Sequence, residues 1–160
     1  MKAKARKSII DLETLPGHYI RRLQQIAVAV FLQETEAHGL TPVQYSALQG
    51  IENSPGVDQR TLARTIGFDT STTASVIDRL EARGLVQRNA SPTDKRVRLL
   101  TLTDEGRTLL ADVVPSMRRA QERMLDPLSS TDRAEFMRML RTLVQANNEL
   151  SRAPGEAREQ

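Results

Sequence analysis

The chain has 160 residues and a formal net charge of +3, a length that predicts one domain, or one core with appended helices, with a real hydrophobic interior. It contains no cysteine, which excludes disulfides, thiolate chemistry and cysteine-ligated metals and is typical of a reducing compartment. The longest apolar run, Ile26 to Leu32, is far shorter than the ~20 residues of a membrane-spanning helix, and the basic start lacks the apolar core of a signal peptide. We therefore expect a cytoplasmic protein without a membrane segment.

The basic residues are concentrated in the middle of the chain. Eight basic and five acidic residues fall between positions 58 and 98, so this segment accounts for the whole excess of 23 basic over 20 acidic residues. Arginine, whose planar fork suits phosphates and base edges, supplies 19 of the 23. Charge alone leaves both a nucleic-acid surface and an ordinary solvated face open.

Apolar residues at helical spacing predict a first long helix from about Leu15 to Ala37, ended by Gly39. A second helix begins at Thr41, where the sequence "TPVQ" offers an N-cap, a proline at the first helical position and a capping-box glutamine. The sequence "NSPG" ends this second helix.

Two short helices follow, the first capped by Asp58 and ended by Gly67, the second capped by Asp69 or Thr70 and ended by Gly84. The period then changes toward that of strands, since "LVQR" and "VRLLTL" flank the turn-forming "NASPTDKR" and predict a hairpin with a long tip.

Two long helices complete the chain. Thr103 caps the first, which Pro115 is expected to kink, and Ser129 caps the second. This order of elements predicts a mainly α fold with a small β-hairpin wing, in which a winged helix-turn-helix at residues 41–102 lies between helical segments at 12–39 and 104–152. The apolar stripes of these flanking helices are too long for the central module to cover, so we expect a second copy of the chain to cover them.

The helix predicted to end at Gly84 opens with many hydroxyl residues, namely Thr70, Ser71, Thr72, Thr73 and Ser75. Serine and threonine are mediocre helix formers, so their number at this end has no evident packing reason. Short donors and acceptors let a helix approach phosphates and base edges in the major groove. Capping of an exposed helix end explains the same residues, and both interpretations stay open.

The neighbouring elements add cations to this helix. The preceding helix carries Arg60, Thr61 and Arg64, which suit phosphates, and the hairpin tip carries Lys95 and Arg96. An arginine on a wing can enter a narrow, AT-rich minor groove. Asp94 is placed to hold Arg96 by a charge-assisted hydrogen bond. A solvated turn is the alternative for the tip.

The run "TTASVIDRLEARGLVQRNASPTDKRVRLLTLTDEG" resembles the recognition helix and wing of the MarR family of bacterial transcription regulators, and the helix order agrees over nearly the whole chain. The resemblance implies a homodimer whose first and last helices form the dimerisation region and whose two winged domains bind half-sites of a pseudo-palindromic duplex. It also implies base and backbone contacts by the recognition helix and a wing arginine. The complete predicted interface is Arg60, Thr61, Arg64, Ser71, Thr72, Thr73, Ser75, Arg79, Asp94, Lys95 and Arg96.

The resemblance further implies repression as the default behaviour, relieved by a small aromatic acid that binds between the dimerisation helices and the winged domain. The candidates are His18 and Arg22, which share a helix face beside Tyr19, together with Tyr45. A benzoate-, cinnamate- or nicotinate-like compound fits such residues, and "LPGHYIRRLQQIAVAVF" is similar to regulators of aromatic-acid or nicotinate catabolism. The alternative is that the tyrosines belong to the dimer core and that His18 and Arg22 are solvated or paired with acids.

No catalytic, metal or cofactor site is predicted. His18 and His38 are the only histidines, and twenty residues along one helix turn by about 200° and rise by about 30 Å, which keeps them apart. There is no phosphate-binding glycine loop, H-E-x-x-H or nucleophile elbow. The remaining alternative is a winged-helix adaptor that binds protein, which would bind duplex without the steep salt dependence of counterion release.

Overall fold

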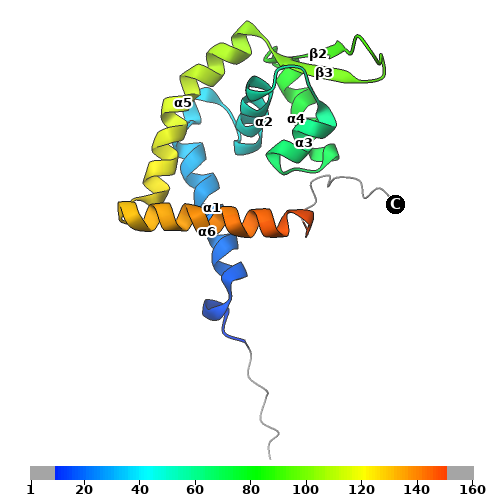
Figure 1. The fold of residues 1–160 in the computed structure, drawn as a ribbon. Coiled ribbons are helices and arrows are strands. Elements are labelled where there is room, and N and C mark those ends of the chain that lie inside the picture. Colours follow the sequence, from blue (N-terminus) through cyan, green and yellow to red (C-terminus); the bar gives the residue numbers. More distant parts are fainter. Residues whose placement is uncertain (1–9, 151–160) are drawn as a thin grey trace, which may run out of the picture.

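The computed structural model describes residues 10–150, so the last two residues of the segment predicted at 104–152 lie outside it. Helices dominate the described part, and Figure 1 shows α5 as a long diagonal helix that connects the winged module to α6. The elements in chain order are α1 (Pro16–Glu34), α2 (Pro42–Asn53), β1 (Val57–Asp58), α3 (Gln59–Ile66), α4 (Thr70–Ala82), β2 (Val86–Ala90), β3 (Arg98–Leu102), α5 (Asp104–Leu125) and α6 (Ser130–Asn147), with short 3₁₀ turns at Leu12–Thr14, Glu36–His38 and Asn148–Leu150.

The predicted helix starts are confirmed. At the start of α2, the Thr41 hydroxyl accepts from the Gln44 amide at 3.3 Å while the Gln44 side chain accepts from the Thr41 amide at 3.0 Å, which completes the capping box. Side-chain oxygens of Asp58, Asp69, Thr103 and Ser129 cap the helices that follow them, which are α3, α4, α5 and α6 respectively. Each cap satisfies an amide that the first turn leaves without a helical partner.

The first helix is shorter than predicted. It ends at Glu34, and a 3₁₀ turn replaces its expected last turn before Gly39 takes a left-handed conformation with φ 59°. Thr35, which is almost fully buried, donates its hydroxyl to the Phe31 carbonyl at 2.8 Å and so stabilises the change of direction. Later in the chain, α5 includes Pro115 and is not interrupted by it.

The wing belongs to a three-stranded antiparallel sheet with the order β1-β3-β2. The hairpin register pairs Val86 with Leu102 and Ala90 with Arg98. The short strand β1 was not predicted from the sequence, because two residues carry no detectable period. It pairs Val57 with Leu100 and thereby ties the start of α3 to the sheet.

A hydrophobic core joins the sheet to α2, α3 and α4. Residues from all of these elements are fully buried: Leu48, Ile51, Leu62, Ile77, Leu80 and Leu100. Gly50 permits the close approach of α2 and α3, since a Cβ there would lie 2.7 Å from Leu62 Cδ1. The module therefore carries its own interior, which Leu110 and Val113 of α5 extend.

The start of α5 is fastened to the turn that ends α4. The Thr103 hydroxyl donates to the Gly84 carbonyl at 2.6 Å, and the Thr103 amide donates to the Leu85 carbonyl at 3.1 Å. Gly106 makes this contact possible, because a Cβ at that position would lie 2.1 Å from the Leu85 carbonyl oxygen.

The flanking helices are less covered than the winged module. α1 packs along α5, with Glu34 accepting from Arg119 and Arg123 at 3.2 Å each. α6 crosses α1 in Figure 1 and contains no buried residue. Within residues 10–150, no helix combines the length and the apolar character needed to cross a membrane.

Candidate nucleic-acid interface and effector region

Helix α4 presents a polar stripe to solvent. Ser71, Ser75 and Arg79 are all exposed, and their four-residue spacing places them on one helix face. None of the ion pairs among the described residues involves Arg79. This face therefore offers two hydroxyls and one unpaired cation to a ligand.

Thr73 does not belong to this stripe, and its predicted DNA contact is wrong. The side chain is fully buried, and its hydroxyl donates to the Asp69 carbonyl at 2.9 Å. The physical reason is helical phase, since Thr73 lies three and four residues before the buried Val76 and Ile77 and therefore shares their face.

Thr61 and Thr72 also form hydrogen bonds at helix starts, in their case with the side chains of the capping residues. The Thr61 hydroxyl donates to the Asp58 carboxylate at 2.6 Å, and the Thr72 hydroxyl donates to the Asp69 carboxylate at 2.8 Å. A hydroxyl has one hydrogen to donate, so neither has one left for a phosphate oxygen in this geometry. The hydroxyls of these two threonines therefore serve the helix caps.

The two capping carboxylates are held in the ionised form. Hydrogen bonds from the amide and hydroxyl of Thr72 hold the pKa of Asp69 below its usual value. Burial acts to raise the pKa of Asp58, but hydrogen bonds from Thr61 outweigh burial and lower it. Both negative charges lie at helix N-termini, where the helix dipole favours them.

Two arginines line the exposed side of α3. Arg60 and Arg64 are exposed and four residues apart, hence on one face of that helix. Neither takes part in an ion pair within the described part of the chain. Such solvated guanidinium groups are suited to phosphate oxygens.

The wing tip has the support that the sequence predicts. Asp94 Oδ1 accepts from the Arg96 amide at 3.0 Å and from Arg96 Nε at 3.3 Å. The Arg96 side chain is 92% exposed despite this contact. The buried Ser91 accepts from the Asp94 amide at 3.4 Å, so the tip is an ordered turn that presents Arg96, with Lys95 exposed beside it.

Three of the four predicted effector residues lie together on α1. The rings of His18 and Tyr19 meet edge to face with centroids 5.5 Å apart. Tyr19 and Arg22 line a groove of about 650 Å³ between α1 and α6. The apolar side chains of that groove, which we call the α1–α6 groove, are Pro16, Ile20, Leu23, Ile26, Phe136, Met139, Leu140 and Leu143.

Tyr45 is not part of this cluster. Its ring lies 5.9 Å from that of Phe31, and its hydroxyl donates to the Gln49 side chain at 3.4 Å. Burial raises the pKa of Tyr45, and the positive charge of Arg118 opposes this. Phe31 follows Tyr19 by twelve residues, about 18 Å along the helix, so the four predicted residues do not converge on one site within a protomer.

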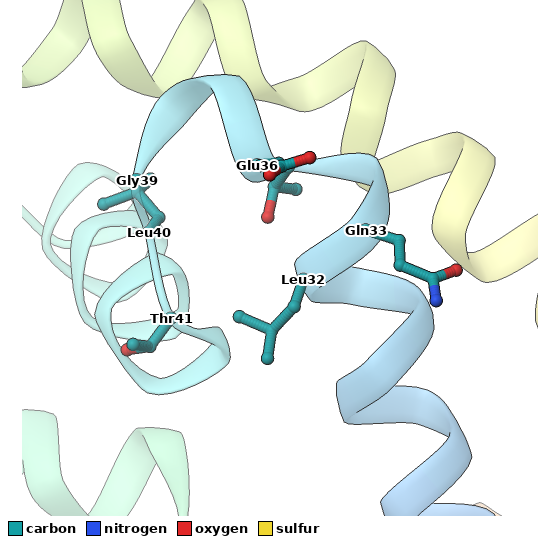
Figure 2. Close-up of a pocket in the computed structure, with 7 residues that line it drawn as sticks. Leu32, Gln33, Glu36, Gly39, Leu40 and Thr41 are labelled. Atoms are coloured by element: carbon teal, nitrogen blue, oxygen red, sulfur yellow. The ribbon is translucent and has the colours of Figure 1, made fainter.

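A second groove of about 470 Å³ lies between the end of α1 and the start of α2. Figure 2 shows Leu32 projecting from α1 toward the segment that holds Leu40 and Thr41. Glu36 is the charged residue of its lining, and a carboxylate there disfavours an acidic ligand. Among residues 10–150, no group of three histidine or carboxylate side chains could hold a metal ion.

Comparison with known proteins identifies the family. A model of the MarR family matches residues 38–97, which lie almost entirely within the winged module. The transcriptional regulator HosA of Escherichia coli O111:H- is 34% identical over 129 residues, which cover 81% of this chain and 94% of HosA. The chain belongs to the MarR family of transcriptional regulators.

Solved structures of similar proteins agree with this MarR-family fold. The transcriptional repressor CouR, bound to a 23-mer DNA duplex, is 32% identical with a TM-score of 0.80, and the match covers 88% of this chain and 99% of that one. BpsR of Bordetella bronchiseptica, whose DNA binding is regulated by 6-hydroxynicotinic acid, is 28% identical with a TM-score of 0.81, covering 85% and 97% of the two chains.

The role of Arg88 was not predicted from the sequence. It was counted with the basic excess, yet its guanidinium pairs with Asp78 and Glu81 of α4. The signal was strand alternation, because Arg88 lies two residues after the buried Val86 and so points to the same side of β2. The basic surface therefore contains one free cation fewer than the sequence indicates.

Proposed function

We propose that this MarR-family chain is a homodimeric repressor that binds a pseudo-palindromic DNA operator and releases it when a small aromatic acid binds. The observation that carries the proposal is the set of exposed cations on α3, α4 and the wing tip, together with the free hydroxyls of α4. The polar stripe of α4 is suited to the major groove, where the N-terminal part of a recognition helix contacts base edges.

The flanking residues are suited to the DNA backbone. Arg60 and Arg64 of α3 would neutralise phosphates beside the major groove, which fixes orientation without reading sequence. Lys95 and Arg96 would follow the adjacent minor groove, where a narrow, AT-rich stretch attracts arginine. A protein-binding adaptor has no need for such exposed cations, so we take the DNA-binding function as the better supported of the two.

The dimer is supported by apolar side chains that the protomer leaves exposed. Tyr19 and Ile20 of α1 are 53% and 59% exposed, and Leu143 and Val144 of α6 are 54% and 64% exposed. A second copy would bury these faces against each other. The 23-mer duplex bound by CouR is about two turns of B-DNA, enough for two half-sites one turn apart.

The effector proposal is supported by the α1 cluster and by BpsR. Arg22 can form a bidentate pair with a carboxylate, and the Tyr19 ring can stack on an aromatic acid. BpsR responds to 6-hydroxynicotinic acid, which combines these two features. His18 would donate a further hydrogen bond to the same ligand.

Replacing Arg96 by alanine is expected to weaken operator binding by about 1–3 kcal/mol, roughly 5- to 150-fold. The loss of one cation close to the DNA should also reduce the slope of log K against log salt by about 0.9. Gel-shift titrations at several salt concentrations measure both quantities. The matched control is Arg133→Ala, which removes the same charge at the start of α6, and unchanged affinity in Arg96→Ala would refute the wing assignment.

A panel of benzoate, cinnamate and nicotinate derivatives is expected to contain a compound that raises the melting temperature and weakens operator binding. Ligand that binds only the folded state stabilises it by mass action, by about 2.7 kcal/mol at one hundred times its Kd. Arg22→Ala should remove the shift because the carboxylate loses its partner. A panel without any hit, or an undiminished shift in Arg22→Ala, would contradict the site.

A further inference from the structure

Arg88 connects the wing to the helix that carries the polar stripe. From β2, its Nη2 lies 2.5 Å from an Asp78 oxygen and its Nη1 lies 2.5 Å from a Glu81 oxygen. The same Nη2 lies 3.5 Å from the side-chain oxygen of Gln59 at the start of α3. One guanidinium on β2 thus contacts both α3 and α4.

The guanidinium of Arg88 is partly shielded from solvent. Its side chain is 21% exposed, whereas those of Asp78 and Glu81 are 68% and 41% exposed. Burial acts to lower the pKa of Arg88, but the hydrogen bonds that it donates to the two carboxylates outweigh burial and raise it. Charge-assisted hydrogen bonds of this kind are stronger than neutral ones and depend on the planar fork of arginine.

The two carboxylates define one side of α4. They are three residues apart and therefore neighbours on the helix surface. A rotation of α4 about its axis, or a tilt of the hairpin, would separate at least one of them from the fork. Asp78 also precedes Arg79 of the polar stripe, so any such rotation would turn the stripe as well.

We infer that Arg88 is a positioning residue, which fixes the angle between the wing and α4 so that Arg96 and the polar stripe reach adjacent grooves of one duplex together. This inference rests on the DNA interface proposed above. Arg88 itself does not contact DNA, because both of its terminal nitrogens are engaged by α4. Its contribution to affinity therefore passes through Arg96 and the stripe.

The first test is a double-mutant cycle between Arg88 and Arg96. Arg88→Met keeps an unbranched apolar stem and removes the fork, and it is expected to weaken operator binding at least about tenfold. In the Arg88→Met background, Arg96→Ala should lower log K for operator binding by at most half as much as it does in the wild type, because the wing is no longer held in place. Additive effects, with a salt slope reduced by about 0.9 in Arg88→Met, would overturn the inference and indicate a direct phosphate contact.

The second test separates geometry from charge. Arg88→Lys keeps the charge and loses the fork, so positioning predicts weakened binding, whereas full activity of Arg88→Lys would overturn it. The pair Asp78→Ala and Glu81→Ala removes two negative charges near the DNA. Simple electrostatics predicts tighter binding by this double variant, and positioning predicts weaker binding.

Each variant is compared with the wild type by thermal melting of the free protein, which identifies loss of folding. If Arg88→Met does not fold, the lysine variant and the double alanine variant decide the outcome. Failure of the wild type itself to bind any duplex would contradict the proposed function, whereas additive cycles in a protein that binds would contradict only the role of Arg88.

Discussion

Replacing Leu143 by glutamate is expected to convert the proposed dimer into monomers and to lower affinity for a two-half-site duplex by about a hundredfold or more. Leu143 lines the α1–α6 groove and is 54% exposed in the protomer, so a charge there is solvated in the monomer. In a dimer that covers the groove, the same carboxylate would be buried without a partner. Loss of the second winged domain then removes the avidity factor, typically 10² to 10⁴.

Sedimentation equilibrium measures the oligomeric state, and a gel-shift titration with one and two half-sites measures affinity. Gln145→Glu is the matched control, because it introduces the same side chain at an exposed α6 position, two residues from Leu143 and hence on the opposite helix face. A Leu143→Glu variant that remains dimeric would exclude the α1–α6 groove as the dimer interface.

Replacing Gly106 by alanine is expected to destabilise the fold by about 3 kcal/mol or more, at the upper end of the cost of overpacking. The added Cβ would lie 2.1 Å from the Leu85 carbonyl oxygen, which is backbone and therefore has no rotamer by which to move away. For a chain of this size the melting temperature should fall by roughly 6–12 °C.

Thermal unfolding followed by circular dichroism measures this shift. Gly17→Ala is the control, since nothing lies within 4 Å of a Cβ at Gly17 in the first turn of α1. Alanine has the higher helix propensity, so the control is expected to melt at the same temperature or higher. Equal melting temperatures of the Gly106→Ala variant and the wild type would contradict this prediction. They would mean that α5 can move away from the turn after α4 without loss of stability.

Features that depend on a few adjacent residues could be predicted from the sequence. The caps at Thr41, Asp58 and Asp69 need only a side-chain oxygen and amides two or three residues away. The Asp94–Arg96 contact is equally local. What could not be predicted depends on how separate elements meet, as Arg88 shows, because its partners on α4 lie seven and ten residues earlier in the chain.

Two other differences from the sequence-based predictions have different origins. Thr73 was assigned to DNA from its residue type without its helical phase, although the buried Val76 and Ile77 define that phase. Tyr45 was grouped with His18 and Tyr19 because aromatic residues are few, yet the distance along α1 separates them. Residue type indicates which chemistry a side chain can perform, but the backbone conformation decides which side chains lie together on one surface.

The joint between Thr103 and the turn at Gly84 has a mechanical consequence for the proposed dimer. Through this joint α4, the helix proposed to contact the major groove, is attached to one end of α5, which is about 33 Å long for its 22 residues. If α5 tilts by about 10° about its C-terminal end, its N-terminal end, which is joined to α4, moves by about 6 Å. This displacement is close to the rise of two base pairs. A ligand that rotates the two subunits apart by a small angle would thus change the spacing of the two α4 helices. They would then no longer match successive major grooves of the operator.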